Sequence, residues 1–142
     1  MKAAVATVFP GLFTAFLETG VVGRAVRDGL VTVSLLDIRD HPVDARGSVD
    51  DYQFGGGAGM IMRPEPLFSA LESLEWGRDA RVVLMSPRGR RLDTGLAREL
   101  AGEERLAVFC GRYGGVDERF RTAVTDEICV GDAVVSGGEI PA

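Results

Sequence analysis

The chain has 142 residues, of which 46% are hydrophobic and 26% are charged, and its formal net charge is −5. This composition is typical of one compact domain with a hydrophobic core, and the acidic balance argues against a generally basic nucleic-acid binder. The sequence contains no apolar run of membrane-spanning length, and its two cysteines, Cys110 and Cys129, lack metal-type spacing. We therefore expect a cytoplasmic protein with no secretory signal, membrane segment, metal site or disulfide framework.

Strand-like and helical segments alternate along the chain. Short apolar runs predict strands at 3–9, 31–36, 82–85, 106–109 and 127–130, and helical spacing predicts helices near 12–17, 22–27, 64–74 and 92–100, with another beginning at Asp117. The third strand is expected to break at Ser86, and the polar segment 37–54 is expected to be a long loop. Strand, helix, strand order implies parallel crossovers. The predicted fold class is therefore α/β, a mostly parallel sheet with helices on both faces.

Two glycine-rich blocks, 110–119 and 130–139, each follow a predicted strand, and a third glycine loop spans 55–60. Glycine lets the backbone approach a ligand closely and exposes N–H and C=O groups for recognition. Because ligands bind at the carboxyl ends of strands in open α/β sheets, we expect the two blocks to lie at the ends of neighbouring strands and to cradle a flat cofactor. Tight turns that hold no ligand are the alternative.

Fifteen of the sixteen cationic residues are arginine, the residue suited to bidentate phosphate contacts. The densest group is Arg88, Arg90 and Arg91. Two interpretations of this group stay open at this point, a solvated surface segment and a phosphate-binding patch.

Five parts of the chain together resemble one family, namely Tyr52 and the segments 55–60, 84–92, 110–119 and 130–142. They are similar to the bacterial tRNA (guanine-N1)-methyltransferases, the TrmD family of the SPOUT class, and the resemblance covers the whole chain. It implies a trefoil-knotted domain that binds S-adenosyl-L-methionine, with each active site at the interface of an antiparallel homodimer. Residues 1–142 would form this domain. We interpret the chain as truncated, without the C-terminal tRNA-binding domain, because it ends where a helix is expected to begin.

The resemblance also implies site residues. The cofactor would be held, largely through backbone atoms, by Ser86, Pro87, Gly111, Tyr113, Val130, Gly131, Asp132, Ala133, Val134, Val135, Gly137 and Gly138. The substrate would contact Gly56, Gly57, Gly59, Met60 and Arg112. The chain departs from the family at Gly114, where an acidic residue is usual, and at Ala133, where an aromatic one is usual. The first change is expected to weaken catalysis and the second to weaken cofactor binding.

By the resemblance, the reaction is methylation of N1 of the tRNA guanine immediately 3′ of the anticodon. Guanine N1 carries a proton, so the reaction requires a base to remove it and charge stabilisation at O6. The family's aspartate base would lie beyond Ala142, so no residue here takes that role, and Glu118 and Asp132 are only the nearest carboxylates. Asp117 is expected to cap a helix instead. We predict that the isolated chain is inactive and meets tRNA only through the full-length enzyme.

Two other functions compete with this interpretation. One is a non-catalytic module that binds the cofactor or self-associates. The other is a nucleotide-phosphate enzyme that holds anions in its glycine loops. The second is disfavoured because no loop carries the Gly-Lys-Ser/Thr pattern of a phosphate loop.

Overall fold

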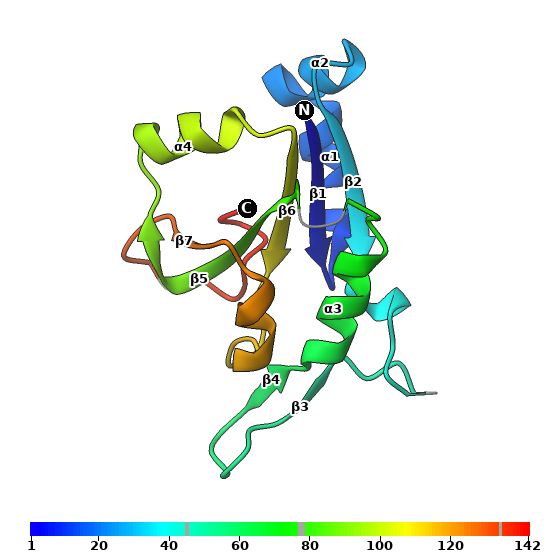
Figure 1. The fold of residues 1–142 in the computed structure, drawn as a ribbon, viewed down its shortest axis with the longest axis vertical. Coiled ribbons are helices and arrows are strands. Elements are labelled where there is room, and N and C mark those ends of the chain that lie inside the picture. The colour runs from blue at the N-terminus through cyan, green and yellow to red at the C-terminus, as the bar shows by residue number, and fades with distance from the viewer. Residues whose placement is uncertain (45, 77–78, 134) are drawn as a thin grey trace.

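The computed structural model describes residues 1–44, 46–76, 79–133 and 135–142. Its centre is a five-stranded sheet with the order β2-β1-β6-β5-β7, in which neighbouring strands are parallel (Figure 1). The strands of this sheet are β1 (Lys2–Thr7), β2 (Thr32–Asp37), β5 (Arg81–Arg91), β6 (Arg105–Cys110) and β7 (Asp126–Cys129). A separate antiparallel hairpin consists of β3 (Asp50–Tyr52) and β4 (Met60–Met62), and it extends away from the sheet.

Short helices connect the strands. The α-helices in the described residues are α1 (Thr14–Glu18), α2 (Gly20–Arg27), α3 (Pro64–Glu72) and α4 (Thr94–Ala101). The 3₁₀ helices there are η1 (Pro10–Leu12), η2 (Ile38–Asp40) and η4 (Glu118–Ala123). Within the same residues, no helix has the length and apolar character needed to traverse a bilayer.

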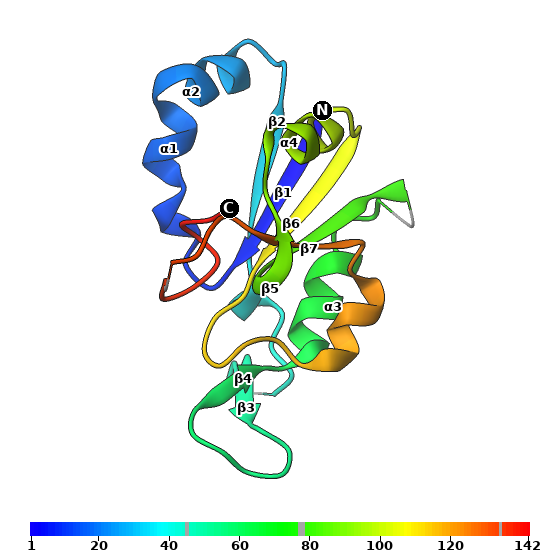
Figure 2. The same ribbon diagram turned by 90° about the vertical axis from the view of Figure 1, so that its left-hand side faces the viewer.

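One face of the sheet packs against α3 and η4 and carries the larger hydrophobic cluster (Figure 2). Leu84 of β5 and Phe109 of β6 project from this face and contact the cluster that contains Leu67 of α3. The ring of Phe120 from η4 lies 4.8 Å from that of Phe109 and 5.3 Å from that of Phe68, measured between centroids. These aromatic contacts fix η4 against the sheet, and η4 begins at Glu118, within block 110–119.

The opposite face of the sheet is covered by α1 and α4. Leu96 of α4 packs on Val83 and Met85 of β5, and Phe13, just before α1, packs on Val5 of β1. Because successive strand residues point to opposite faces, Val83 and Met85 face α4 while Leu84 faces α3. The prediction of a mostly parallel sheet with helices on both faces is therefore confirmed.

The predicted strands all form, but two expectations about irregular segments are wrong. The strand expected to break at Ser86 continues to Arg91, because β5 resumes its pairing with β7 after a register shift between Met85 and Arg90. Met85 and Arg90 are both in register with Ile128, so the four residues between them are bulged out of the ladder before the pairing resumes. The segment 37–54, expected to be a loop, contains η2 and β3, and β4 follows it. These strands have only three residues each, which is too short for a periodic signal.

Side-chain caps explain where two helices begin. The Asp93 carboxylate accepts a 2.8 Å hydrogen bond from the Leu96 N–H at the start of α4. The Asp117 carboxylate accepts a 2.9 Å hydrogen bond from the Arg119 N–H at the start of η4, so its predicted capping role is confirmed. Such caps satisfy N–H groups that have no partner within the helix.

Candidate functional site

The two glycine-rich blocks meet at the carboxyl edge of the sheet, although their strands are not neighbours. Block 110–119 begins at the end of β6 and block 130–139 follows β7, but β5 lies between these strands. The expectation that the two strands are neighbours is therefore wrong. β5 precedes β6 in the chain, but in the sheet it lies between β6 and β7 and pairs with each of them. The loops themselves make the contact, since the Gly138 N–H donates a 2.8 Å hydrogen bond to the Gly111 carbonyl oxygen.

Close packing explains the glycines at the end of block 130–139. A Cβ at buried Gly138 would lie 2.8 Å from Cys110 Cα, closer than real side-chain contacts allow, and a Cβ at Gly137 would collide with the Arg112 side chain. A Cβ at Gly131, in contrast, would meet no described atom within 4 Å. The block thus starts in open space and ends packed against β6.

The segment that follows β7 lies at the surface. The predicted cofactor residues that are exposed or half-buried here are Val130, Gly131, Asp132, Ala133 and Val135. Val134, also predicted, lies outside the described residues. Val130 and Val135 are 44% and 43% exposed. This segment is therefore accessible to a ligand.

Ser86 and Pro87, predicted to contact the cofactor, lie on β5 just after Met85, which is in register with Cys110 of β6. Ser86 therefore lies beside the start of block 110–119. A Cβ at Gly111 would be 3.5 Å from the Met85 carbonyl oxygen, an ordinary contact. The structure thus brings the bulge of β5 and both glycine blocks together at one edge of the sheet.

The loop 112–117 binds the β3–β4 hairpin through main-chain hydrogen bonds. The Gly114 N–H donates to the Met60 carbonyl oxygen at 2.7 Å, and the Met62 N–H donates to the Gly115 carbonyl oxygen at 2.9 Å. Tyr113, which lies between Arg112 and Gly114 in the chain, has a φ of 59°, a left-handed conformation that is uncommon for a tyrosine. The predicted cofactor residue Tyr113 and the predicted substrate residue Met60 are therefore held side by side.

The other predicted substrate glycines, Gly56, Gly57 and Gly59, lie in the exposed turn between β3 and β4. All three have positive φ values, of 84°, 133° and 89° respectively. Glycine adopts such conformations without the strain that other residues suffer. The turn extends away from the sheet (Figure 1), so these glycines do not adjoin the meeting point of the two blocks.

A buried ion pair joins the two blocks to the end of β1. Arg112 Nε donates a 2.8 Å hydrogen bond to Oε2 of Glu139, and the Thr7 hydroxyl donates a 2.8 Å bond to Oε1 of the same carboxylate. Arg112 Nη1 also donates to the Ser136 carbonyl oxygen at 3.2 Å. The Arg112 guanidinium carbon lies 4.6 Å from the centroid of the Phe9 ring, within the range of a cation–π contact.

Burial raises the pKa values of a thiol and a phenol in block 110–119. Burial raises the pKa of the Cys110 thiol to about 12, and the Glu139 carboxylate adds to the rise. Burial also raises the pKa of the Tyr113 phenol, with the Asp50 carboxylate contributing. Both groups are therefore protonated at neutral pH and act as neutral side chains.

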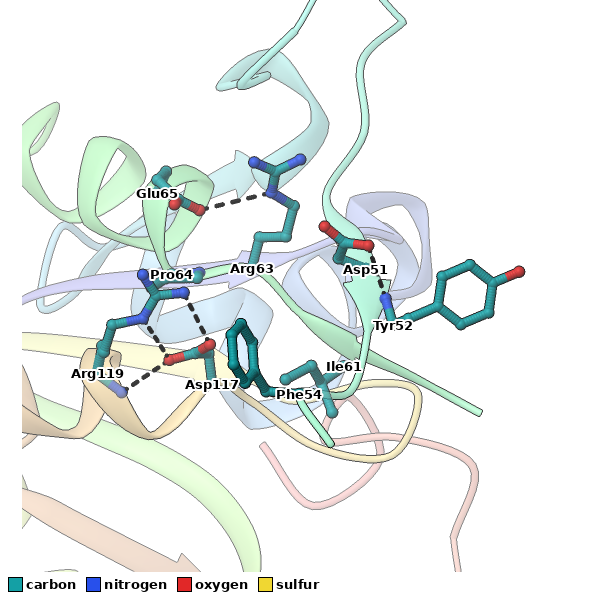
Figure 3. Close-up of a pocket in the computed structure, with 9 residues that line it drawn as sticks. All are labelled: Asp51, Tyr52, Phe54, Ile61, Arg63, Pro64, Glu65, Asp117 and Arg119. Atoms are coloured by element: carbon teal, nitrogen blue, oxygen red, sulfur yellow. Dashed lines mark hydrogen bonds and ion pairs between the residues drawn. The ribbon is translucent and has the colours of Figure 1, made fainter. Parts of the chain in front are cut away.

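A hollow of about 170 Å³ lies between the hairpin, the start of α3 and the start of η4 (Figure 3). It is lined by Asp51, Tyr52, Phe54, Ile61, Arg63, Pro64, Glu65, Asp117 and Arg119. Four of its five charged side chains form ion pairs, with Arg119 Nε 2.9 Å from Asp117 Oδ1 and Arg63 Nε 3.5 Å from Glu65 Oε2, while the Asp51 carboxylate accepts a hydrogen bond from the Tyr52 N–H. None of the residues predicted for the cofactor or substrate lines it.

A second hollow, of about 360 Å³, adjoins the buried ion pair. Its lining comprises Leu12, Phe13, Phe16, Arg112, Ser136, Glu139, Ile140 and Ala142. Arg112 is the predicted site residue in this lining, which otherwise is mostly apolar. In the described part of the chain, no three His, Cys, Asp or Glu side chains form a group that could hold a metal ion.

Three carboxylates of the glycine blocks, those of Asp117, Glu118 and Asp132, each lie beside an arginine side chain. A hydrogen bond from Arg119 lowers the pKa of Asp117, and one from Arg88 lowers the pKa of Glu118. Asp132 Oδ2 lies 3.9 Å from Arg91 Nη1, and its side chain is 96% exposed. A carboxylate with a lowered pKa is a weaker base, so neither Asp117 nor Glu118 is suited to remove the guanine proton.

The group Arg88, Arg90 and Arg91 belongs to the bulged end of β5. Each side chain faces an acidic partner, with Arg88 lying 2.8 Å from Glu118 and Arg90 lying 3.6 Å from Glu99. The ion pair of Arg91 with Asp132 is the third. All three arginine side chains are more than half exposed and lie beside carboxylates, which agrees with the solvated-surface interpretation.

Sequence reasoning did not find Thr7, Phe9 or Glu139. Glu139 stands in the second glycine block, but a sequence does not reveal that a carboxylate is buried. Its side chain is only 2% exposed, and charged groups at that depth are rare unless they are paired. The sequence signal that could have marked Glu139 is its position directly after two glycines, Gly137 and Gly138.

The fold and the meeting glycine blocks define an α/β domain with the architecture of a solved tRNA methyltransferase. The crystal structure of the tRNA (m1G37) methyltransferase from Aquifex aeolicus superposes with a TM-score of 0.90 and 38% sequence identity, covering 99% of this chain and 64% of that one. Residues 1–142 match the family described as tRNA (Guanine-1)-methyltransferase TrmD. The chain therefore belongs to the TrmD family.

Two relatives illustrate the similarity. The chain is 50% identical over 146 aligned residues to the tRNA (guanine-N(1)-)-methyltransferase of Moorella thermoacetica, covering all of this chain and 58% of that protein. It is 44% identical over 140 residues to the enzyme of the same name from Persephonella marina, covering 98% of this chain and 55% of that protein. The chain thus spans little more than half the length of these curated relatives.

Proposed function

We propose that this chain is the methyl-donor-binding part of an enzyme that uses S-adenosyl-L-methionine to methylate N1 of the tRNA guanine immediately 3′ of the anticodon. Membership of the TrmD family and the names of the relatives support the methyl-transfer reaction on tRNA guanine. The observation that carries the proposal for this chain is the hydrogen bond from Gly138 to Gly111, which brings both glycine blocks together at the carboxyl edge of the sheet.

The residues at this edge fit a cofactor that is recognised through backbone groups. Ser86, Gly111 and the segment after β7 surround the meeting point, and the open space at Gly131 leaves room for a ligand against the main chain. S-Adenosyl-L-methionine supplies an electrophilic methyl group on its sulfonium sulfur. In this proposal, main-chain N–H and C=O groups of 130–135 hold the adenine edge, while Arg112 and Tyr113 adjoin the methionine end and the target base.

Titration of the 142-residue chain with S-adenosylhomocysteine tests the cofactor site. We expect binding of S-adenosylhomocysteine and none of ATP. Because a Cβ at Gly131 would meet no described atom within 4 Å, we expect Gly131→Val to keep the fold and to fill the space that the ligand needs. The variant should therefore lose affinity by at least about tenfold with an unchanged unfolding midpoint. Failure of the parent chain to bind would overturn the cofactor assignment, and binding of ATP instead would favour the nucleotide-phosphate alternative.

We also propose that the 142 residues alone do not methylate tRNA, which makes the chain in isolation a cofactor-binding or self-association module. The ion-paired state of Asp117 and Glu118 favours this alternative, since general-base catalysis typically contributes roughly 10²–10⁴-fold. Transfer of labelled methyl groups to a tRNA with guanine after its anticodon should stay at background. Measurable transfer would contradict the proposal and direct attention to Asp117, Glu118 and Asp132.

A homodimer is the third part of the proposal. Leu12, Phe16 and Ile140 are 61%, 58% and 80% exposed and surround the 360 Å³ hollow, an apolar surface of the kind that marks protein contacts. Sedimentation at micromolar concentration should give about twice the chain mass of 15.2 kDa. A monomer at that concentration would contradict self-association through this surface.

A further inference from the structure

Glu139 is a charged side chain in a position where charge is costly. Its carboxylate is 2% exposed, and both of its oxygens accept hydrogen bonds, one from the Thr7 hydroxyl and one from Arg112 Nε. Burying an ionised carboxylate costs several kcal/mol unless such partners compensate for the lost water. Apolar residues of similar volume generally stabilise a fold as well as a buried ion pair does. Stability of the fold alone therefore does not account for the ion pair between Glu139 and Arg112.

The buried pair holds the Arg112 guanidinium on three sides. Glu139 binds Nε, the Ser136 carbonyl oxygen binds Nη1, and the Phe9 ring lies against its face. A residue with four side-chain torsions is thereby restricted to one conformation before any ligand arrives. The other side of the same carboxylate is fixed by Thr7, whose hydroxyl oxygen also accepts a 2.9 Å hydrogen bond from the Phe9 N–H. The end of β1 thus fixes both Glu139 and the aromatic ring beneath Arg112.

The small residue at position 137 belongs to the same arrangement. A Cβ there would collide with the Arg112 side chain and would lie 2.6 Å from Oε2 of Glu139. Gly137 therefore leaves the space through which the guanidinium reaches the carboxylate. The Arg112 side chain is 20% exposed, and it lines the 360 Å³ hollow at the edge of the sheet.

We infer that Glu139 is a positioning residue: its buried carboxylate, fixed by Thr7, sets the orientation in which Arg112 meets the ligand. The statement about the ligand rests on the proposed function, in which Arg112 adjoins the methionine end of the cofactor and the target base. Preorganised arginine groups lose less conformational entropy when a ligand binds.

The first arm of the test follows Arg112 itself and needs no ligand. In the NMR spectrum of the chain, the Arg112 Nε–H signal is identified by its disappearance in Arg112→Lys. We expect its exchange with solvent to be slow in the parent chain and faster by at least about tenfold in Glu139→Gln. Glu118→Gln is the matched control, because it removes an exposed carboxylate from Arg88 and Arg121. An unchanged exchange rate in Glu139→Gln would overturn the inference.

Thr7→Val keeps the test decisive if Glu139→Gln fails to fold. This variant removes the hydroxyl that binds Oε1 and leaves the charge pair in place. It should also increase the exchange rate of the Arg112 Nε–H, by a smaller factor than Glu139→Gln. Unchanged exchange in folded Thr7→Val would contradict the role of Thr7 in fixing the carboxylate and would overturn the inference as stated.

The second arm measures affinity for S-adenosylhomocysteine in Glu139→Gln, Arg112→Gln and the double variant. A positioning role predicts that each single change lowers affinity by about tenfold and that the double change adds little, because both remove the same oriented guanidinium. Parent-like affinity in folded Glu139→Gln would reduce Glu139 to a structural role and overturn the inference. If the parent chain itself does not bind, the proposed function fails, and the exchange measurement still decides whether Glu139 positions Arg112.

Discussion

Arg81 of β5 and Asp126 of β7 form a two-point ion pair, with Nε 2.7 Å from Oδ2 and Nη2 3.0 Å from Oδ1. Both side chains are less than one-fifth exposed, and Arg81 also donates to Glu103 Oε1 at 3.1 Å. The pair joins the start of β5 to the start of the edge strand β7. Because β7 delivers the second glycine block, this contact supports the candidate site from the opposite end of the sheet.

The Arg81–Asp126 pair predicts a loss of stability in acid. The hydrogen bond from Arg81 lowers the pKa of Asp126 in the folded chain. A depressed folded pKa means that the contribution is complete above the unfolded value, near 4, and is lost as the pH falls through the folded value. Asp126→Asn should therefore lower the free energy of unfolding at pH 7 by about 1–3 kcal/mol and flatten its decline below pH 4. Urea unfolding at pH 7 and pH 3 measures both effects.

Asp79→Asn is the control for this prediction. Asp79 lies 3.7 Å from Arg105 and its side chain is 86% exposed, so the change should alter stability by less than about 0.5 kcal/mol. Equal effects of the two substitutions would show that the Arg81–Asp126 pair has no special contribution.

The contact between the glycine blocks predicts a contrast between two alanine variants. Gly138→Ala places a Cβ 2.8 Å from Cys110 Cα and should destabilise the fold by about 1–3 kcal/mol, because backbone atoms have to move. Gly131→Ala meets no described atom within 4 Å and should leave stability unchanged. Thermal or urea unfolding distinguishes the two, and equal stability of both variants would refute the packing argument.

Burial predicts unequal reactivity of the two cysteines. The raised pKa of Cys110, about 12, leaves a thiolate fraction of about 10⁻⁴ at pH 8, and its side chain is buried. Cys129 is partly exposed. Iodoacetamide should therefore modify Cys129 in the native chain and both cysteines in urea. Mass spectrometry of the digested protein locates the label, and rapid native labelling of Cys110 would contradict its burial.

The aromatic cluster beneath the site predicts a large effect at Phe120. This fully buried ring contacts Phe109 and Phe68, so Phe120→Ala should destabilise the chain by about 3–5 kcal/mol. Phe54→Ala removes a fully exposed ring outside the proposed dimer surface and should cost less than about 1 kcal/mol. A small effect at Phe120 would mean that η4 is not held by this cluster.

Local sequence patterns predicted most of the sheet, because each buried strand is a short apolar run bounded by polar or glycine residues. They did not predict the order of the strands. Block 110–119 and block 130–139 follow consecutive strands in the chain, yet β5 lies between those strands, and pairing partners depend on contacts between distant residues. The bulge after Met85 was missed for the same reason, since Ser86 and Pro87 locally resemble the end of a strand.

The proximity of the two glycine blocks was predicted and is confirmed by the hydrogen bond between Gly138 and Gly111, whereas their role as a cofactor cradle stays a prediction. The assignment of single residues to the cofactor and substrate stays a prediction. Glu139 was not found, because its importance comes from depth and partners, which only the folded chain defines. The resemblance to the TrmD family supplied the expected site residues and reaction, and membership of the family is confirmed by the match over residues 1–142.

The position of β1 in the sheet has a consequence for how the protein is made. β1 pairs with β2 on one side and with β6 on the other, so its second edge finds a partner only after about a hundred further residues have been synthesised. Until then, the nascent chain exposes an apolar strand with unpaired backbone groups, the kind of edge that recruits other chains. Productive folding on the ribosome therefore waits for β6, and shortened N-terminal fragments that lack it should aggregate.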